Sequence, residues 1–191
     1  MPSDTTLLAF DTSAAHCAAA LFCDGRVMAT HVDEMARGQA EHLMPMLEDF
    51  LARKGKRWSD LTRIGVGIGP GNFTGIRISV AAARGLALGL GIPAIGVSTL
   101  DALHHLQPDK TVAVAAPRDM LYAQQPGKAA ALVASCDAPD AVQSDDPHRL
   151  IAALAEVAAL RDAATADRPK PLYVKPADAA PARDTAPVIL S

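Results

Sequence analysis

The order of its apolar segments restricts this chain to few folds. Three short apolar segments come first, at residues 7–10, 16–23 and 26–32. Asp24-Gly25, between the last two, is a two-residue hairpin signal. Helical and extended patterns then alternate along the chain. Hairpin-connected strands followed by such alternation predict a mixed sheet with helices packed on it, in the order β-β-β-α-β-α-β-α.

The alternating part contains the helices and the remaining strands. The apolar spacing predicts helices at 41–54, 76–90 and 98–106 and strands at 63–68 and 94–97. The whole order matches the ribonuclease-H-like half-domain of the actin and sugar-kinase ATPases. We therefore expect an α/β protein with the actin-like or Hsp70-like ATPase fold, whose mixed sheet has flanking helices. Such a fold analogy by itself says nothing of activity.

Composition changes near residue 108. Twelve of the 13 glycines lie before Thr111, whereas 9 of the 14 prolines and 23 of the 39 alanines lie after it. The front part therefore has the tight turns of a compact unit, and the rear has thinner, helix-prone segments such as 150–164. We expect an N-terminal half at 1–108 that carries the function. A reduced C-terminal half with an Ala/Pro-rich tail is expected at 109–191.

Charge and cysteine usage exclude several classes of protein. A net charge of −3 argues against a dedicated nucleic-acid coat, which would be basic along one face. The three cysteines have no Cys-x-x-Cys spacing, which excludes a disulfide framework or a zinc knuckle and fits a reducing cytosol. The apolar stretch 78–97 contains Arg84, glycines and Pro93, so we expect a soluble helix and strand rather than a membrane span. We expect no metal site.

The tripeptide Asp11-Thr12-Ser13 follows the first expected strand. In the actin-like ATPase layout, an Asp here would hold a magnesium-bound water, and the hydroxyls and backbone N–H groups would face phosphate. The alternative, which the tripeptide alone favours, is a turn in which Asp11 accepts local backbone hydrogen bonds.

A glycine-rich loop at residues 69–75 lies between an expected strand and an expected helix. The start of that helix offers free N–H groups and partial positive charge, which suit an anion or a partner's carboxylate. The spacing is neither a Walker A loop nor a dinucleotide fingerprint, and a purely structural tight turn is the alternative. The candidate nucleotide- or anion-binding residues are Asp11, Thr12, Ser13, Gly69, Gly71, Asn72, Thr74 and Gly75.

Small residues form stripes along the helix that follows this loop. Ala81, Gly85 and Gly89 fall four apart on one face, and Ala83, Ala87 and Gly91 form a neighbouring stripe. Glycine inside a helix costs about 1 kcal/mol relative to alanine. Such a cost indicates that another backbone approaches closely, either that of the chain's own sheet or that of a second protein.

Several segments together resemble the TsaB family, also called YeaZ. The match covers about the first 105 residues, and a further segment at 171–176 looks like the family's closing segment. The segments that carry the resemblance are Leu8-Ala9-Phe10-Asp11-Thr12-Ser13, Arg37-Gly38-Gln39-Ala40-Glu41-His42-Leu43-Met44-Pro45-Met46, the loop at 69–75, Ile76-Arg77-Ile78-Ser79-Val80-Ala81, and Gly96-Val97-Ser98-Thr99-Leu100.

The resemblance implies a non-catalytic accessory protein. TsaB-like proteins pair with the catalytic subunit TsaD and act with the ATPase TsaE to install N6-threonylcarbamoyladenosine in tRNAs that read ANN codons. It implies no cofactor of its own and tRNA contact only through the complex, and it leaves open whether ATP or ADP binds at the joint interface. It further implies a cytoplasmic protein, and exposed pairing helices would allow a homodimer when the partner is absent.

Pairing in this family uses helices of the N-terminal half, which here would be those at 41–54 and 76–90. The partner-binding residues expected on them are Leu43, Leu47, Phe50, Ile76, Val80, Ala83 and Ala87.

The sequence departs from the family pattern at two positions, and one alternative function remains. Gln39 stands where the family often has His, and Asn72 where it often has Ser. The rival is a small actin-like ATPase or sugar-kinase-like enzyme that uses Asp11 and the loop at 69–75. Such an enzyme needs a second phosphate loop after residue 113, where Gly127 is the only glycine. The peptidase activity sometimes ascribed to relatives needs two histidines at a spacing that can bind one metal ion, which the sequence lacks.

Overall fold

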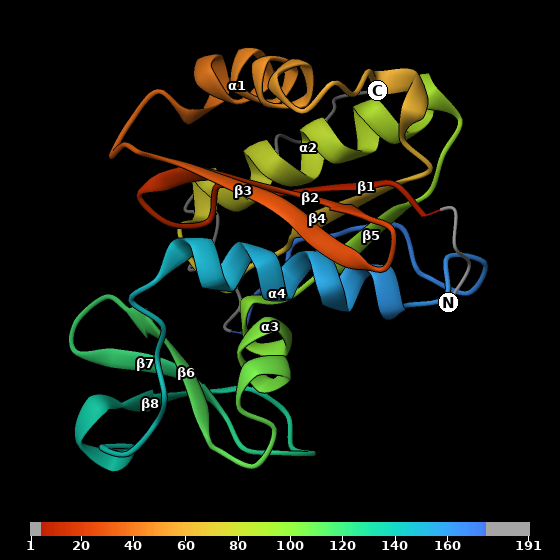
Figure 1. The fold of residues 1–191 in the computed structure, drawn as a ribbon. Helices are drawn as coiled ribbons and strands as arrows, with labels where there is room; N and C mark the ends of the chain where they lie inside the picture. Colours follow the sequence, from red (N-terminus) through yellow and green to blue (C-terminus); the bar gives the residue numbers. More distant parts are fainter. Residues whose placement is uncertain (1–4, 175–191) are drawn as a thin grey trace, which may run out of the picture.

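A five-stranded mixed sheet forms the centre of the protein, whose computed structural model describes residues 5–174. The strand order is β3-β2-β1-β4-β5 (Figure 1). Pairing is antiparallel along β3-β2-β1 and parallel along β1-β4-β5. The strands are β1 (Leu7–Asp11), β2 (His16–Cys23), β3 (Arg26–Glu34), β4 (Arg63–Gly67) and β5 (Ala94–Val97).

Helices cover both faces of this sheet. On one face lie α1 (Gln39–Arg53) and α2 (Phe73–Leu90) (Figure 1). On the other lies α4 (Pro147–Leu160), with α3 (Thr99–Leu106) packed beside it. Because both faces are covered, all five residues of the central strand β1 are buried. The predicted α/β fold with a mixed sheet and flanking helices is confirmed.

The second helix begins earlier than predicted. Asn72 is its N-cap, and the Asn72 side chain accepts a hydrogen bond from the Gly75 N–H at 2.9 Å. Thr74 and Gly75, predicted to lie in the loop, therefore form the first turn of α2. At the other end, Gly91 closes the helix in the left-handed conformation.

The part of the chain after residue 108 forms two different structures. A three-stranded antiparallel sheet comes first, built from β6 (Val112–Ala116), β7 (Met120–Gln124) and β8 (Ala131–Ala134). Helix α4 then returns to the five-stranded sheet. Helix α4 shares a core with strands from the start of the chain. The division into two halves at residue 108 stays a prediction. The expected Ala/Pro-rich tail lies mostly outside the described residues.

Alanines and one glycine allow α4 to approach the sheet closely. Ala155 and Ala158 of α4 are fully buried in one cluster with Ala18 and Ala20 of β2. A Cβ added at Gly65 of β4 would lie 3.0 Å from the Ala158 Cβ, so both positions need small side chains. Some of the alanines after residue 108 therefore belong to the core between α4 and the five-stranded sheet.

Among the described helices, α2 alone is long and apolar enough to cross a membrane by length and composition. It nevertheless connects β4 to the parallel strand β5. Ile76, Val80 and Ala83 are buried against the sheet, and the Ser79 Oγ donates to the Gly67 carbonyl at 3.1 Å. In this structure α2 is the crossover helix of a βαβ unit.

The close packing of α4 predicts the effect of a larger side chain. Ala158→Leu should lower the free energy of unfolding by about 1–3 kcal/mol, because the added methylenes overpack a well-filled contact. Urea denaturation measures this change. The control is Ala152→Leu on the same helix, at a partly exposed position, with an expected change within about 0.5 kcal/mol. Equal effects of the two variants would contradict the packing described here.

Candidate functional site

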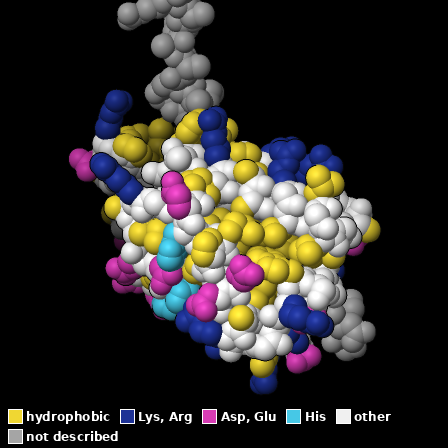
Figure 2. Space-filling model, turned by 90° about the horizontal axis from the view of Figure 1, so that it is seen from above, with side chains coloured by type: hydrophobic (Ala, Val, Ile, Leu, Met, Phe, Trp, Pro, Cys, Tyr) yellow, Lys and Arg dark blue, Asp and Glu magenta, His cyan; other side chains and the backbone are white. Residues whose placement is uncertain are grey.

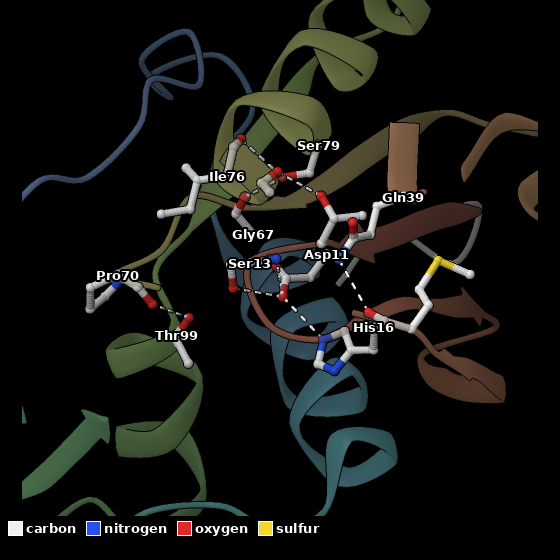
Figure 3. Close-up of polar contacts among 12 residues, drawn as sticks. Asp11, Ser13, His16, Gln39, Gly67, Pro70, Ile76, Ser79 and Thr99 are labelled. Atoms are coloured by element: carbon white, nitrogen blue, oxygen red, sulfur yellow. Dashed lines mark hydrogen bonds and ion pairs between the residues drawn. The ribbon is translucent and has the colours of Figure 1, made fainter. Parts of the chain in front are cut away.

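The glycine-rich loop and the turn after β1 lie side by side at one edge of the sheet (Figure 3). The parallel strands β1 and β4 both end there, at Asp11 and Gly67. In α/β sheets, ligands commonly bind at this carboxyl edge. The structure thus brings together all of the residues predicted to bind a nucleotide or anion.

The Asp11 carboxylate interacts with residues of the turn in which it lies. Its Oδ2 accepts hydrogen bonds from the Ser13 N–H at 3.1 Å and the Ser13 Oγ at 2.8 Å, and it lies 3.4 Å from the His16 Nε2 (Figure 3). The residue is 7% exposed. A Cβ at Gly67 would collide with the Asp11 Oδ1, which has no hydrogen-bond partner among residues 5–174. These contacts match the interpretation of the tripeptide as a local turn.

The backbone of the loop packs directly on the backbone of this turn. The Thr12 Oγ1 donates to the Gly75 carbonyl at 2.7 Å, and the Asn72 N–H donates to the Ser13 carbonyl at 2.7 Å. A Cβ at Gly75 would collide with the Thr12 carbonyl oxygen, and one at Gly71 with that of Ser13. The chain's own backbone therefore explains both glycines.

The first residues of the loop are held by the start of α3. Gly69 has a φ of +90°, which favours glycine, and it precedes Pro70 through a cis peptide bond. The Thr99 N–H donates to the Gly69 carbonyl at 2.9 Å, and the Thr99 Oγ1 donates to the Pro70 carbonyl at 3.5 Å (Figure 3). The loop is thus held on both sides, by the Asp11 turn and by the start of α3.

Little of this arrangement is open to solvent. Thr12, Ser13, Gly69 and Gly75 are buried with Asp11, whereas Asn72 and Thr74 are exposed at the start of α2. A cavity behind Asp11, lined also by His16, Thr99 and apolar side chains of α4, has a volume of about 10 Å³. That is about the space one water molecule needs. Binding of a nucleotide or anion at this edge stays a prediction.

An aromatic cluster that no sequence pattern predicts lies at the start of α2. The Arg77 guanidinium lies 3.7 Å from the centroid of the Phe73 ring, which stacks on Tyr173 with 5.2 Å between centroids. The Arg77 Nε also donates to the Tyr173 Oη at 3.1 Å. The Leu172 N–H donates to the Ile68 carbonyl at 2.8 Å. The segment that resembles a family closing segment thus returns to the glycine-rich loop; its last two residues lie outside the described range.

Comparisons with known proteins identify the family. A family model described as "TsaD: tRNA N6-adenosine threonylcarbamoyltransferase" matches residues 31–176, more than half of the chain. The chain belongs to this TsaD-type family. Its relatives and structural neighbours are named TsaB or YeaZ, and we therefore call it TsaB-type.

Two named relatives are tRNA threonylcarbamoyladenosine biosynthesis proteins TsaB. The Escherichia coli K12 protein is 44% identical over 94 residues, which are 49% of this chain and 40% of that protein. The Haemophilus influenzae protein is 39% identical over 99 residues, which are 51% of this chain and 41% of that protein. This TsaB-type chain thus spans about two fifths of the length of these curated relatives.

Two solved structures from Pseudomonas aeruginosa share the fold. One is described as an uncharacterized protein with similarity to peptidase YEAZ; it has a TM-score of 0.73 at 26% identity and covers 90% of this chain and 100% of its own. The other, described as YeaZ, has a TM-score of 0.68 at 27% identity and covers 88% of this chain and 99% of its own. The likeness extends well beyond the front part of the TsaB-type chain that the motifs cover.

The predicted partner-binding residues need correction. All of them except Ala87 are buried in the chain's own core, between the two helices and the sheet: Leu43, Leu47, Phe50, Ile76, Val80 and Ala83. Each helix has one apolar face, and in this TsaB-type fold that face covers the sheet. A partner cannot reach these side chains while the protein is folded.

Other residues of the same helices form the outer surface. We define the α1–α2 surface by Met44, Ala81, Gly85, Leu88 and Gly89, which are all exposed. Leu88 is 84% exposed, and a Cβ added at Gly85 or Gly89 would meet nothing within 4 Å. Figure 2 shows hydrophobic side chains gathered in a band across this side of the molecule. The glycine stripe of the TsaB-type chain therefore faces away from its own sheet.

Two histidines and an aspartate join α1 to β3. The Asp33 carboxylate lies 2.6 Å from the His42 Nε2 of α1 and 3.1 Å from the His31 Nε2 of β3. The hydrogen bond with His42 is the main cause that holds the pKa of Asp33 below its ordinary value. The carboxylate therefore stays charged and orients the first turns of α1.

Two further observations concern side chains that could take part in chemistry. Burial raises the pKa of the Cys17 thiol to about 11, so this thiol stays protonated near neutral pH. Within residues 5–174, no group of three or more His, Cys, Asp or Glu residues is arranged to hold a metal ion.

Two glycine substitutions in the same helix should have opposite effects. Gly75→Ala should lower the free energy of unfolding by about 3 kcal/mol, because its Cβ collides with the Thr12 carbonyl. Gly85→Ala should raise it by about 0.4–1 kcal/mol, because the site is open and alanine favours helix. Urea denaturation of both variants tests this pair. A loss of stability in Gly85→Ala would show that the outer face of α2 is packed within the isolated chain.

Proposed function

We propose that this chain is the non-catalytic partner of a TsaD-type subunit in the modification of tRNA to N6-threonylcarbamoyladenosine. It would act in the cytoplasm with a TsaE-type ATPase, on tRNAs that read ANN codons. Family membership supports the proposal, together with the names of the relatives from E. coli and H. influenzae. The tRNA would be contacted through the complex, and ATP or ADP would bind at the joint interface.

The α1–α2 surface is the observation that carries the proposal. Leu88 stands exposed between Gly85 and Gly89 on the outer face of α2. The fold of the isolated chain leaves open space at both glycines, although each costs about 1 kcal/mol in a helix relative to alanine. Bare backbone on both sides of an apolar side chain suits close packing of a second helix. A TsaD-type subunit is the occupant we propose, with a second copy of this chain when that subunit is absent.

The contacts of the glycine-rich loop support a non-catalytic role. An actin-like ATPase holds phosphate between loops of both halves, with glycine backbone facing the nucleotide. Here Gly71 and Gly75 instead face the carbonyls of Ser13 and Thr12. The Asp11 Oδ2 likewise accepts from Ser13 and lies next to His16. Both candidate phosphate-binding elements thus have partners within the chain.

Complex formation tests the proposed partnership. Leu88→Asp should weaken the complex with the co-expressed TsaD-type subunit of the same organism at least tenfold, because it places a charge in a desolvated contact. The matched control is Leu160→Asp, since Leu160 is 54% exposed at the end of α4 on the other side of the sheet. Co-purification and titration calorimetry measure both variants.

The result has two clear readings. Retention of the complex by Leu160→Asp and its loss in Leu88→Asp would support the surface described. If the unmodified chain and the TsaD-type subunit form no complex when co-expressed, the proposed function fails.

ATP turnover tests the non-catalytic role. The purified chain should hydrolyse ATP no faster than a buffer blank in a phosphate-release assay. Turnover well above the blank that is lost in Asp11→Asn would establish the rival function, an actin-like ATPase.

A further inference from the structure

A groove of about 560 Å³ runs beside the last turns of α2. One side is formed by α2, including Gly85 and Leu88, and the other by residues 163–169, which follow α4. The turn into β5, with Ile92 and Pro93, forms its end. The lining is almost entirely alanine, glycine, proline and aliphatic side chains, so the groove offers an apolar floor.

Two arginines line this apolar groove from opposite sides. Arg84 projects from α2 and Arg168 from the segment after α4, and both are exposed. Across residues 5–174, neither guanidinium is in an ion pair. We call this feature the arginine groove.

Three other arginines of the protein have carboxylate partners within the described residues. The distances are 2.9 Å for Arg53–Asp49, 3.4 Å for Arg57–Asp60 and 2.7 Å for Arg161–Asp101. The chain as a whole is acidic, with a net charge of −3. Asp167, next to Arg168 in the sequence, lies 3.8 Å from Lys170 and does not line the groove. The residues that line the groove therefore include two positive charges and no carboxylate, beside an apolar surface.

The chemistry of the groove selects an acidic peptide segment. A guanidinium binds a carboxylate through two parallel N–H donors. Gly85 and Gly91 leave backbone accessible along one wall, and Ala163 and Ala166 keep the opposite wall low. The groove is partly open to solvent, whereas a small-molecule site buries about 70–90% of its ligand. An extended segment with both carboxylate and apolar side chains fits such a groove.

We propose that the arginine groove receives an acidic segment of the TsaD-type partner. Carboxylates of that segment bind Arg84 and Arg168, and an apolar side chain packs between Leu88 and Ile92. This inference rests on the proposed function, because the groove shares Gly85 and Leu88 with the α1–α2 surface. It predicts that the partner segment is negatively charged. It also extends the contact beyond helix-on-helix packing, to the segment after α4.

Charge reversal tests the inference in the purified complex. Arg84→Glu and Arg168→Glu should each raise the dissociation constant about tenfold, because a carboxylate then faces the acidic segment. Their affinities should also depend less steeply on salt than that of the unmodified protein, since an attractive charge pair is lost. The matched control is Arg149→Glu, at an exposed position on α4 across the sheet, whose dissociation constant should stay the same.

A cross-linking experiment identifies the group that occupies the groove. Arg168→Lys places a primary amine there, and a carbodiimide couples an amine to a carboxylate in contact with it. We expect an amide to an Asp or Glu of the TsaD-type subunit, located by mass spectrometry, and no such product with the parent arginine. Circular dichroism and thermal unfolding of each variant confirm that the fold is retained.

The outcomes separate the two proposals. Absence of any complex with the unmodified chain overturns the proposed function. A complex whose affinity is unchanged by both charge reversals, or falls equally with Arg149→Glu, overturns the arginine groove while leaving the partnership intact. A cross-link to a second copy of this chain, in place of the TsaD-type subunit, also overturns it.

Discussion

The packing of the backbone at Thr12 against the backbone at Gly75 determines the position of α2. The Thr12 Oγ1 and the Asn72 cap fix the first turn of the helix over the end of β1. From that origin the helix crosses the sheet, buries Ile76, Val80 and Ala83, and turns its other side outward. The outer surface proposed for the partner therefore depends on a contact at the opposite end of the same helix, where no Cβ can be accommodated.

Glycine has two opposite physical roles within this one helix and its loop. Gly71 and Gly75 are required because the chain's own carbonyls approach them. A Cβ added at Gly85 or Gly89 would meet nothing within 4 Å. These two glycines therefore lower the stability of the helix, and no contact within the monomer requires them. The first pair maintains the fold, and the second pair is suited to an assembly. A TsaB-type protein with a small core can thus present bare backbone without weakening its central sheet.

The order of the elements could be predicted because each has a local signal: Asp24-Gly25 marks the hairpin, and the spacing of Leu43, Leu47 and Phe50 marks a helix. The same spacing led to a wrong assignment of these side chains to a partner, because an apolar helix face does not reveal what covers it. The place of α4 could not be predicted either, since its packing on β1 and β2 joins residues far apart in the sequence. The placement of Arg84 and Arg168 on one groove likewise joins residues far apart in the sequence.

Helix α4 covers a face of the sheet whose central strands, β1 and β2, lie within the first 23 residues. On a ribosome, Leu7, Ala9 and Phe22 are therefore synthesised long before Ile151 and Leu154, the side chains that shield them. Until then the emerging sheet has one side covered by α1 and α2 and the other side exposed to water. This face of the sheet is covered only when α4 has left the exit tunnel, so the nascent chain presents an apolar surface until that point.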